Sequence, residues 1–442
     1  MNVTLLAAVV MGLAMMMRAH AQTLDTSKLD QLCDRLLAKH KGMGGLILAK
    51  DGRVLYSRSF GYSQVNGTET KPLTATTKYK ISSITKTFTA VMVLQLVEEG
   101  KLKLNDPLEK WFPQIPNADR ITLEQMLTHR SGIPNTEPDR SWGIQPRTKD
   151  EVIARIANGR PDFEPGTKSR YCNAGYVLLG YIVERAGGQA YSEALKERIT
   201  AKIGLMDTYL GVGNTDVSRN ESLAYRYLGS WKESDQFDYS VTGGAGAILS
   251  TPTDLTKFIQ ALFDLKLVTE DSLNRMRTMI DGEGMGLVTF SFAGKTLYGN
   301  TGGSGSTGAW LAYFPEEKLA LAYTTNAKVY PVSNIVSGVL DIYWNRPFQV
   351  PSFESPTVST AVLDRYVGLY SSPGAPAKAK ITRDGITLLF QPPGTSSGVP
   401  LEAMAENKFQ IEGMVVIEFD TMKRQMTIKR RNGVERVFSQ DN

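Results

Sequence analysis

Residues 83–97 read Ser-Ile-Thr-Lys-Thr-Phe-Thr-Ala-Val-Met-Val-Leu-Gln-Leu-Val, and this stretch decides the predicted fold. Its apolar residues predict a buried helix over residues 84–99 that Gly100 terminates. Ser83 opens the helix and Lys86 follows on the same face. The positive end of the helix dipole favours negative charge on the serine oxygen, and burial favours a neutral lysine that can accept a proton. The pair therefore suggests a serine nucleophile with a lysine base.

Ser-x-x-Lys is a weak signal on its own, because chance gives about one match in a chain of this length. An N-capping serine followed by a surface lysine is the alternative. Histidine offers little competition as a base, since the chain has only His20, His40 and His129. His129 could serve in a Ser-His-Asp triad, but no Gly-x-Ser-x-Gly elbow accompanies it.

Tyr171-Cys172-Asn173 precedes an apolar helical stretch and forms a second element. A tyrosine beside a lysine can carry a proton to a leaving group, and an asparagine amide can hold both the lysine and a substrate carbonyl. A loop tyrosine with an Asn cap is the alternative. Tyr343-Trp344-Asn345 has a similar pattern, but it ends the last helix of the main domain, so we reject it.

Asn300-Thr301-Gly302-Gly303 is the third element and lies between two strand-like segments. Paired glycines let a substrate backbone approach closely, and a free N–H there can face an oxyanion. A Gly-rich hairpin turn is the alternative. Val241-Thr242-Gly243-Gly244 is similar, but it precedes a helix start at Thr253-Asp254 instead of a strand.

Strand and helix patterns surround these elements. A helix is expected over residues 27–41, then a hairpin with its turn at Asp51-Gly52, and further strands over residues 285–325. A final helix over about residues 332–344 would cover the sheet. We predict an α+β fold: an antiparallel sheet flanked by helices, an inserted all-helical subdomain, and a small C-terminal antiparallel barrel over residues 360–442.

Composition limits the class of protein. The chain has 442 residues, of which 42% are hydrophobic and 21% charged, with a formal net charge of +5. These values indicate a globular protein of two or three domains and give no support for nucleic-acid binding. Cys33 and Cys172 are the only cysteines, and we expect no disulfide between them. Cysteine and histidine are too few for a zinc site, and we predict no metal and no cofactor.

The first residues resemble a secretory signal. Val3 to Met17 is apolar but too short to span a membrane as a mature helix, and Ala19-His20-Ala21 offers a small-x-small cleavage site. An uncleaved anchor is the alternative. We expect residues 1–21 to be removed, with no later membrane span, and the protein to be exported to the periplasm or outside the cell.

The three elements, in this order, resemble the serine β-lactamase and penicillin-binding-protein superfamily. The nearest likeness is to its class C β-lactamase-like branch, which includes D-Ala-D-Ala carboxypeptidases, D-aminopeptidases and β-lactamase-fold esterases. The likeness covers about residues 25–345. Connecting stretches share it, namely Leu127–Pro134, Phe163–Thr167, Gly204–Thr208 and Gly246–Asp254.

The resemblance implies a role for each residue. Ser83 would be the nucleophile and Lys86 its base, and Tyr171 would serve the leaving group and the deacylating water. Asn173 would orient Lys86 and the substrate. The strand Asn300-Thr301-Gly302-Gly303 would bind substrate, with the backbone N–H groups of Ser83 and Gly303 forming the oxyanion hole.

Two positions depart from the family pattern. The family usually has Lys or His where this chain has Asn300, which weakens the expected recognition of a substrate carboxylate. Cys172 replaces the commoner serine. The C-terminal region resembles the lipocalin-like domains attached to some of these peptidases, where it would either wall off the cleft or be merely structural.

We therefore expect a signal peptide (1–21), a serine hydrolase domain (22–346), a linker (347–359) and a C-terminal barrel (360–442). The expected substrate is a small peptide that contains D-amino acids, or a β-lactam-like amide. An esterase or acyltransferase on the same fold is one alternative. A non-catalytic penicillin-binding-type sensor is the other.

Overall fold

The computed structural model describes residues 24–135, 140–374, 377–393, 398–411, 415–430 and 432–441. The predicted signal segment, residues 1–21, lies outside the described residues. In the part that is described, no helix is both long and apolar enough to cross a membrane.

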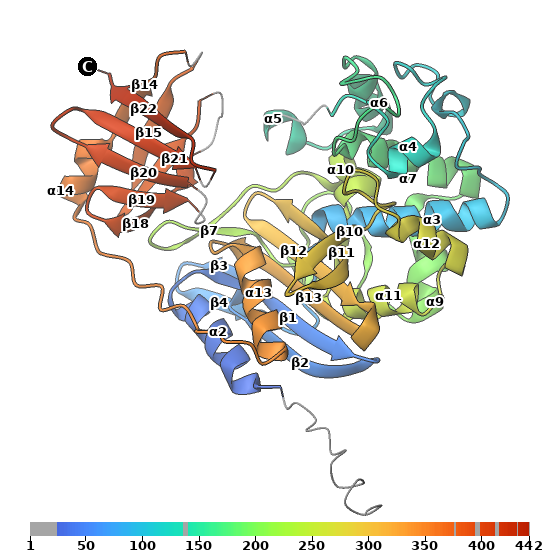
Figure 1. Ribbon diagram of the computed structural model, residues 1–442, viewed down its shortest axis with the longest axis horizontal. Coiled ribbons are helices and arrows are strands. Elements are labelled where there is room, and N and C mark those ends of the chain that lie inside the picture. Colours follow the sequence, from blue (N-terminus) through green and yellow to red (C-terminus); the bar gives the residue numbers. More distant parts are fainter. Residues whose placement is uncertain are drawn as a thin grey trace, which may run out of the picture.

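A six-stranded antiparallel sheet forms the centre of the main body, in the order β10-β11-β12-β13-β1-β2 (Figure 1). Strand β1 pairs with β13, so Ile47 stands opposite Ala322 although the two strands come from distant parts of the chain. This confirms the prediction that the N-terminal hairpin shares a sheet with residues 285–325. The strands are β1 (Gly42–Lys50), β2 (Arg53–Phe60), β10 (Val288–Phe292), β11 (Lys295–Ser304), β12 (Thr307–Phe314) and β13 (Leu319–Lys328).

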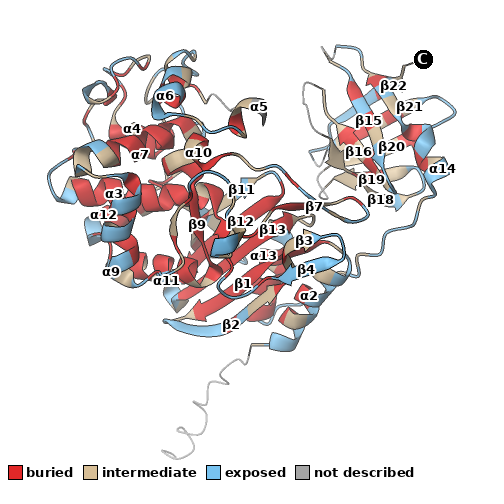
Figure 2. Ribbon diagram, turned by 180° about the vertical axis from the view of Figure 1, so that it is seen from behind, coloured by how far each residue is buried: buried red, intermediate tan, exposed pale blue. Residues whose placement is uncertain are grey.

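Helices cover both faces of this sheet. Leu46 and Leu48 of β1 pack beneath α2 (Thr26–Ala38) and α13 (Val332–Tyr343), in a cluster with Leu32 and Val339. Ile47, which points the other way because side chains alternate along a strand, joins the core of the helical region. Figure 2 shows β13 buried between these layers, and every one of its residues except Lys328 is buried.

Helix α3 (Thr85–Glu98) runs through the middle of the helical region, and its residues from Thr85 to Leu96 are all buried (Figure 2). A helix that is apolar on every side is stable only inside a core. Helices α7 (Asn173–Gly187), α8 (Tyr191–Leu195) and α10 (Tyr239–Gly246) pack against it. The other helices of this region are α4 (Leu123–Leu127), α5 (Arg140–Gly143), α6 (Lys149–Ala157), α9 (Ala201–Ile203), α11 (Pro252–Phe263) and α12 (Glu270–Arg277).

Short strands also occur outside the central sheet, and three of them, β6, β7 and β8, lie in the insertion that was predicted to be all helical. Their alternation is too short to leave a pattern in the sequence. They are β3 (Tyr62–Asn66) with β4 (Glu69–Pro72), β7 (Tyr225–Tyr227) with β8 (Trp231–Glu233), and a three-stranded sheet of β5 (Tyr79–Lys80), β9 (Ile248–Ser250) and β6 (Tyr209–Leu210).

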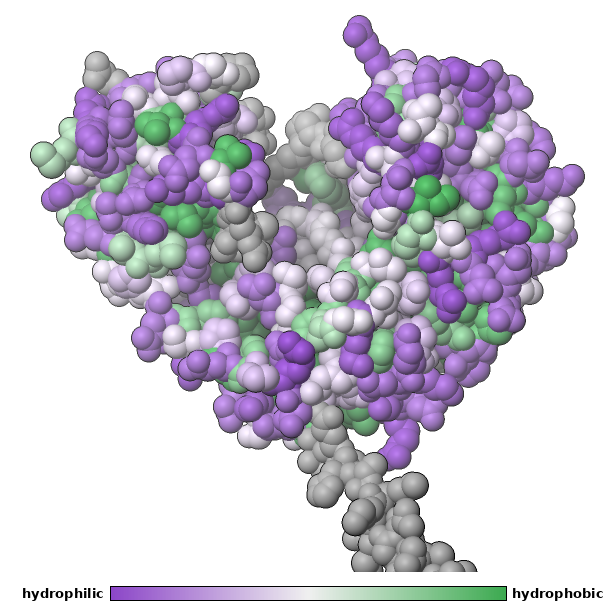
Figure 3. Space-filling view, viewed as in Figure 1, coloured by the Kyte–Doolittle hydropathy of each residue, from purple (hydrophilic) through white to green (hydrophobic). Residues whose placement is uncertain are grey.

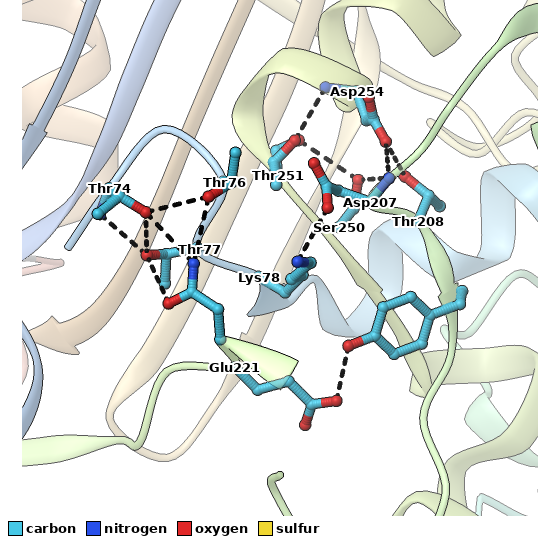
Figure 4. Close-up of polar contacts among 12 residues, drawn as sticks. Thr74, Thr76, Thr77, Lys78, Asp207, Thr208, Glu221, Ser250, Thr251 and Asp254 are labelled. Carbon is cyan, nitrogen blue, oxygen red and sulfur yellow. Dashed lines mark hydrogen bonds and ion pairs between the residues drawn. The ribbon is translucent and has the colours of Figure 1, made fainter. Parts of the chain in front are cut away.

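The three-stranded sheet is held by the polar network of Figure 4. Asp254 accepts hydrogen bonds from the Asp207 N–H (2.8 Å) and the Thr208 hydroxyl (3.0 Å), and Lys78 pairs with Asp207 at 2.9 Å. These contacts join two stretches that carried the family resemblance, residues 204–208 and 246–254. They connect the residues before β6 with α11 and with the residue before β5, and β5 leads into the segment that holds Ser83.

Nine strands between Gly368 and Gln440 form an antiparallel sheet that nearly closes into a barrel (Figure 1). Its core contains Tyr366, Phe409 and Phe419, and Lys41 of the main body contacts Glu402 of the barrel at 2.5 Å. A short helix, α14 (Thr360–Leu363), precedes it. The strands are β14 (Gly368–Ser371), β15 (Ala379–Asp384), β16 (Thr387–Gln391), β17 (Val399–Pro400), β18 (Glu402–Ala405), β19 (Lys408–Ile411), β20 (Val415–Asp420), β21 (Gln425–Arg430) and β22 (Glu435–Gln440).

Candidate active site

Ser83 lies in a single 3₁₀ turn, Ser82–Ile84, immediately before α3. It was expected to open the helix itself, but α3 begins at Thr85 and no side chain caps it. The turn is anchored by a hydrogen bond from the Ile81 N–H to the Ile248 carbonyl (3.1 Å), and Ser82 has a positive φ of 47°. A non-glycine residue in this region is uncommon and persists only where its surroundings hold it. The backbone around Ser83 is therefore fixed by tertiary contacts.

Lys86 is almost fully buried, with 1% of its surface exposed, so the alternative of a surface lysine is wrong. Its Nζ lies 3.0 Å from Ser83 Oγ, 2.8 Å from Asn173 Oδ1 and 2.9 Å from the Ala245 carbonyl oxygen. A neutral amine has two N–H donors and one lone pair. Because Asn173 and Ala245 offer only acceptors near the nitrogen, they can take both N–H groups, and the lone pair then points to the Ser83 hydroxyl.

Tyr171 also lies beside Ser83. Its hydroxyl lies 2.5 Å from Ser83 Oγ, and Lys86 Nζ lies 4.8 Å from the centre of its ring. Cys172 is the N-cap of α7 and its sulfur accepts a hydrogen bond from the Gly175 N–H. Asn173 is thus the first residue of α7. The alternative in which Asn173 caps the helix is therefore wrong.

The loop that contains His129 supports this motif. His129 Nδ1 accepts a hydrogen bond from the Cys172 N–H (3.0 Å), the Arg170 N–H binds the His129 carbonyl oxygen, and the Tyr176 hydroxyl binds the Leu127 carbonyl oxygen. Burial, reinforced by the nearby Lys86, lowers the pKa of His129 to about 3. His129 is therefore neutral at ordinary pH, with one nitrogen occupied by the backbone. It holds Tyr171 in place, and no hydrogen bond joins it to Ser83 among the described residues.

A second loop, residues 162–167, packs on the loop that contains His129. Gly132, with φ of +67°, lies so close to Phe163 that an added Cβ would be 2.1 Å from the Phe163 carbonyl oxygen. The Asp162 N–H binds the Gly132 carbonyl oxygen, and the Gly166 N–H binds that of Arg130. The stretches 127–134 and 163–167, noted in the sequence for their likeness to the family, thus contact each other behind Tyr171.

Strand β11 brings the third element against the Ser83 turn. An added Cβ on Gly302 would lie 2.0 Å from the Ile81 carbonyl oxygen and 3.1 Å from the Ser83 nitrogen. Only glycine allows this approach. The element lies within a strand and not between two, and Gly303 stands opposite Gly308 of β12. Asn300 is buried, and its side chain bridges the Gly286 carbonyl oxygen (3.1 Å) and the Thr301 N–H (2.8 Å).

Two pockets meet at Ser83 and Gly303. The Asn173 pocket has a volume of about 310 Å³ and the Tyr171 pocket about 240 Å³. The Asn173 pocket is lined by Lys80, Ser82, Ser83, Asn135, Trp142, Val152, Arg155, Ile156, Asn173, Ala174, Val177, Phe237, Val241, Thr242, Ala245, Gly246, Gly303, Ser304 and Gly305. The Tyr171 pocket is lined by Ser83, His129, Tyr171, Glu283, Gly284, Gly286, Leu287, Val288, Asn300, Thr301 and Gly303.

The Asn173 pocket continues toward the C-terminal barrel. It shares Phe237, Ser304 and Gly305 with a larger cavity of about 660 Å³, whose other wall includes Leu401 and Phe409 of the barrel. The space-filling view shows the molecule hollowed between the barrel and the helical region (Figure 3). The barrel therefore borders the outer end of the cleft.

Sequence reasoning missed several residues at this site. The Ala245 carbonyl belongs to the stretch beside Val241–Gly244, which we had set aside, and α10 has a kink at Gly243 there. Lys80 is buried, with a pKa lowered to about 8 by desolvation, and donates to the Phe237 carbonyl oxygen. Glu283 lines the Tyr171 pocket. A carbonyl leaves no trace in residue identity, and neither Lys80 nor Glu283 lies in a recognisable motif.

Both cysteines are free and buried, and burial raises the pKa of Cys33 to about 12 and that of Cys172 to about 11. Tyr343, in the rejected Tyr343-Trp344-Asn345 pattern, instead contacts Glu317 and Lys50 at the opposite side of the sheet. Among the described residues, no group of three or more His, Cys, Asp or Glu could hold a metal ion.

The fold and the grouping of serine, lysine and tyrosine are those of the serine hydrolases that act through an acyl-enzyme. A family model described as Beta-lactamase matches residues 29–337, and the chain belongs to this family. Penicillin-binding protein 4* of Bacillus subtilis (strain 168) is 26% identical over 435 residues, which cover 91% of this chain and 93% of that protein.

Two solved structures are also similar. The D-amino acid amidase from Ochrobactrum anthropi SV3 has a TM-score of 0.62 and 27% identity, over 72% of this chain and 99% of the amidase. The octameric penicillin-binding protein homologue from Pyrococcus abyssi has a TM-score of 0.63 and 26% identity, over 94% of this chain and 100% of that one. The second likeness extends across the C-terminal barrel as well.

Proposed function

We propose that this protein is an exported serine hydrolase that cleaves an amide bond of a small D-configured peptide, amino-acid amide or β-lactam-like substrate. One observation carries the proposal: Ser83 Oγ lies within hydrogen-bond distance of both Lys86 Nζ (3.0 Å) and the Tyr171 hydroxyl (2.5 Å), where two pockets meet. The D-amino acid amidase and the penicillin-binding relatives support the choice of substrate class.

In acylation, Ser83 Oγ attacks the substrate carbonyl carbon and its proton passes to Lys86. The backbone N–H groups of Ser83 and Gly303 stabilise the oxyanion of the tetrahedral intermediate. Tyr171 donates its proton to the leaving nitrogen as the C–N bond breaks, and the proton on Lys86 then restores the phenol. In deacylation, water attacks the ester, its proton is taken by the same pair, and the Ser83 oxygen is reprotonated as the acid leaves.

The two pockets receive the two halves of the substrate. Tyr171 protonates the leaving group and lines only the Tyr171 pocket, so the leaving group occupies that pocket. The acyl part then lies in the Asn173 pocket, among apolar side chains such as Val152 and Phe237. A longer acyl part extends toward the C-terminal barrel, which gives the barrel a role in closing the cleft.

An esterase or acyltransferase activity is the second candidate, favoured by one observation: position 300 carries a neutral amide that is engaged by the Gly286 carbonyl and the Thr301 N–H. Such a site has no cation at this position for the free carboxylate of a peptide.

Turnover of matched substrates separates these functions. We expect purified wild-type protein to hydrolyse D-phenylalanine amide and D-alanine p-nitroanilide faster than their L-isomers, with Ser83→Ala as the inactive control. Hydrolysis of p-nitrophenyl esters without any amide turnover would favour the esterase. Mass measurement of the secreted chain tests export, since cleavage after Ala21 leaves Gln22 at the N-terminus.

A further inference from the structure

Glu283 is the acidic side chain that lines the Tyr171 pocket, together with Ser83, Tyr171 and Asn300. It stands in the loop between α12 and β10, and its backbone exchanges hydrogen bonds with Ile280. No hydrogen bond or ion pair engages its carboxylate among the described residues. The loop thus presents an unpaired carboxylate to the cavity that contains the nucleophile.

The described walls of the Tyr171 pocket supply no free positive charge that would neutralise the Glu283 carboxylate. Among the described lining residues of the Tyr171 pocket there is no Lys or Arg, and His129 is neutral because burial lowers its pKa. Nearby Arg130 is already paired with Asp281, which does not line the pocket. Burial raises the pKa of Glu283 and the nearby Lys86 partly offsets this, but Lys86 Nζ is engaged by Ser83, Asn173 and Ala245.

From this arrangement we infer that Glu283 makes the leaving-group pocket selective for a leaving group that carries an ammonium, and adverse to one that carries a carboxylate. The inference rests on the proposed function, because it places the leaving group beside Tyr171. A carboxylate that enters a partly desolvated pocket next to Glu283 would meet a like charge, whereas an ammonium would find a partner. The neutral Asn300 offers no compensating charge.

The substrate class that follows is an amide whose amine portion bears a second, positively charged amine. Basic side chains or a diamine fit this description. An amide that ends in a free carboxylate, as at the C-terminus of an ordinary peptide, does not.

Three amides with one acyl group test this directly. N-acetyl-D-alanyl amides of 1,2-diaminoethane, propylamine and β-alanine differ chiefly in carrying an ammonium, a methyl or a carboxylate at the end of the leaving group. At pH 8, kcat/KM should be at least about tenfold higher for the ammonium than for the methyl compound, and at least about tenfold lower for the carboxylate. Glu283→Gln should bring the three values together, and Asn300→Lys in that background should reverse their order.

Asp281→Asn is the matched control. It removes one negative charge two positions away from Glu283, outside the pocket, and should leave the order of the three amides as in wild type. Equal kcat/KM for the three amides in wild type, or an order unaffected by Glu283→Gln, would overturn the inference.

Labelling of Ser83 by a neutral fluorophosphonate distinguishes failure of the inferred role of Glu283 from failure of the proposed function. If Ser83 is labelled but the charge order is absent, only the role of Glu283 is wrong. If Ser83 is not labelled, the proposed function fails as well. Where the amides are turned over too slowly, competition by the three intact amides against the labelling reaction should give the same order.

Discussion

The hydroxyl of Tyr171 lies 2.5 Å from Ser83 Oγ although 88 positions separate the two residues in the chain. Each is held by a different part of the fold. Ser83 follows a strand of the small three-stranded sheet, whereas Tyr171 is fixed by the loop around His129. The site therefore depends on how the helical region packs on the sheet, and the predictions below address both parts.

Tyr171→Phe should slow acylation by amides about 10²- to 10⁴-fold, because the leaving nitrogen loses its proton donor. Acylation by p-nitrophenyl esters should fall less, since p-nitrophenolate departs without a proton. Burst kinetics of p-nitrophenol release, compared with single-turnover cleavage of a D-aminoacyl anilide, measure the two rates. An equal loss on both substrates would show that Tyr171 has some other role.

Gly302→Ala should reduce activity at least about 10²-fold, because a 1 Å displacement of catalytic groups can have that effect. The new Cβ would lie 2.0 Å from the Ile81 carbonyl oxygen, so the strand or the Ser83 turn must move. At Gly303 the nearest atom to an added Cβ is 3.7 Å away, so Gly303→Ala should leave the fold undisturbed. Melting temperatures and kcat/KM of both variants test this, and an active, stable Gly302→Ala would refute the close approach.

Acid should destabilise the protein partly through His129, whose pKa falls from 6.5 to about 3 on folding. The unfolded chain binds a proton at His129 more readily than the folded protein does. The contribution of His129 to the free energy of unfolding is therefore complete above pH 6.5 and is lost as the pH falls toward 3. The slope attributable to His129 is at most about 1.4 kcal/mol per pH unit. Urea unfolding at pH 7.5 and 5.0 should show a shallower decline for His129→Asn, whose amide oxygen can still accept from Cys172.

His40→Asn is the comparison for that experiment. Burial also lowers the pKa of His40, but this residue is less buried than His129, so its substitution should change the acid dependence less. A wild-type slope in His129→Asn would contradict the assignment of His129 as a buried neutral residue.

Neither cysteine should react in the folded protein. Burial raises the pKa of Cys172 to about 11 and of Cys33 to about 12, so the thiolate is scarce at pH 8. Iodoacetamide should modify neither residue in native buffer and both in denaturant without a reducing agent. Rapid modification of native Cys172, or a requirement for reduction, would contradict this description.

Many of the strands, helices and turns were predictable because each is encoded by a short stretch of neighbouring residues. The Asp51-Gly52 turn, where φ is 49° and 79°, and the apolar run Leu46-Ile47-Leu48 are visible in the sequence. The three motif segments were also visible. Their convergence was not derivable from spacing, because it depends on long-range packing, and it came instead from the family resemblance.

Other parts of the site left no signal. The Ala245 carbonyl that holds Lys86 is a backbone group, and its position follows from the kink at Gly243 and the close contact between Gly244 and Gly180. The strain at Ser82 is likewise invisible in a serine. Glu283 is an ordinary loop residue in the sequence, and only the fold places it in the Tyr171 pocket.

Covalent labelling of the purified protein by a fluorophosphonate, mapped by peptide mass spectrometry, tests the central assignment most directly. We predict a single adduct on the peptide that contains Ser83, none in Ser83→Ala, and labelling at least about 10²-fold slower in Lys86→Ala. An adduct on another residue, an unmodified Ser83, or equal labelling of Lys86→Ala would contradict the account and would favour a binding protein without acyl-enzyme chemistry.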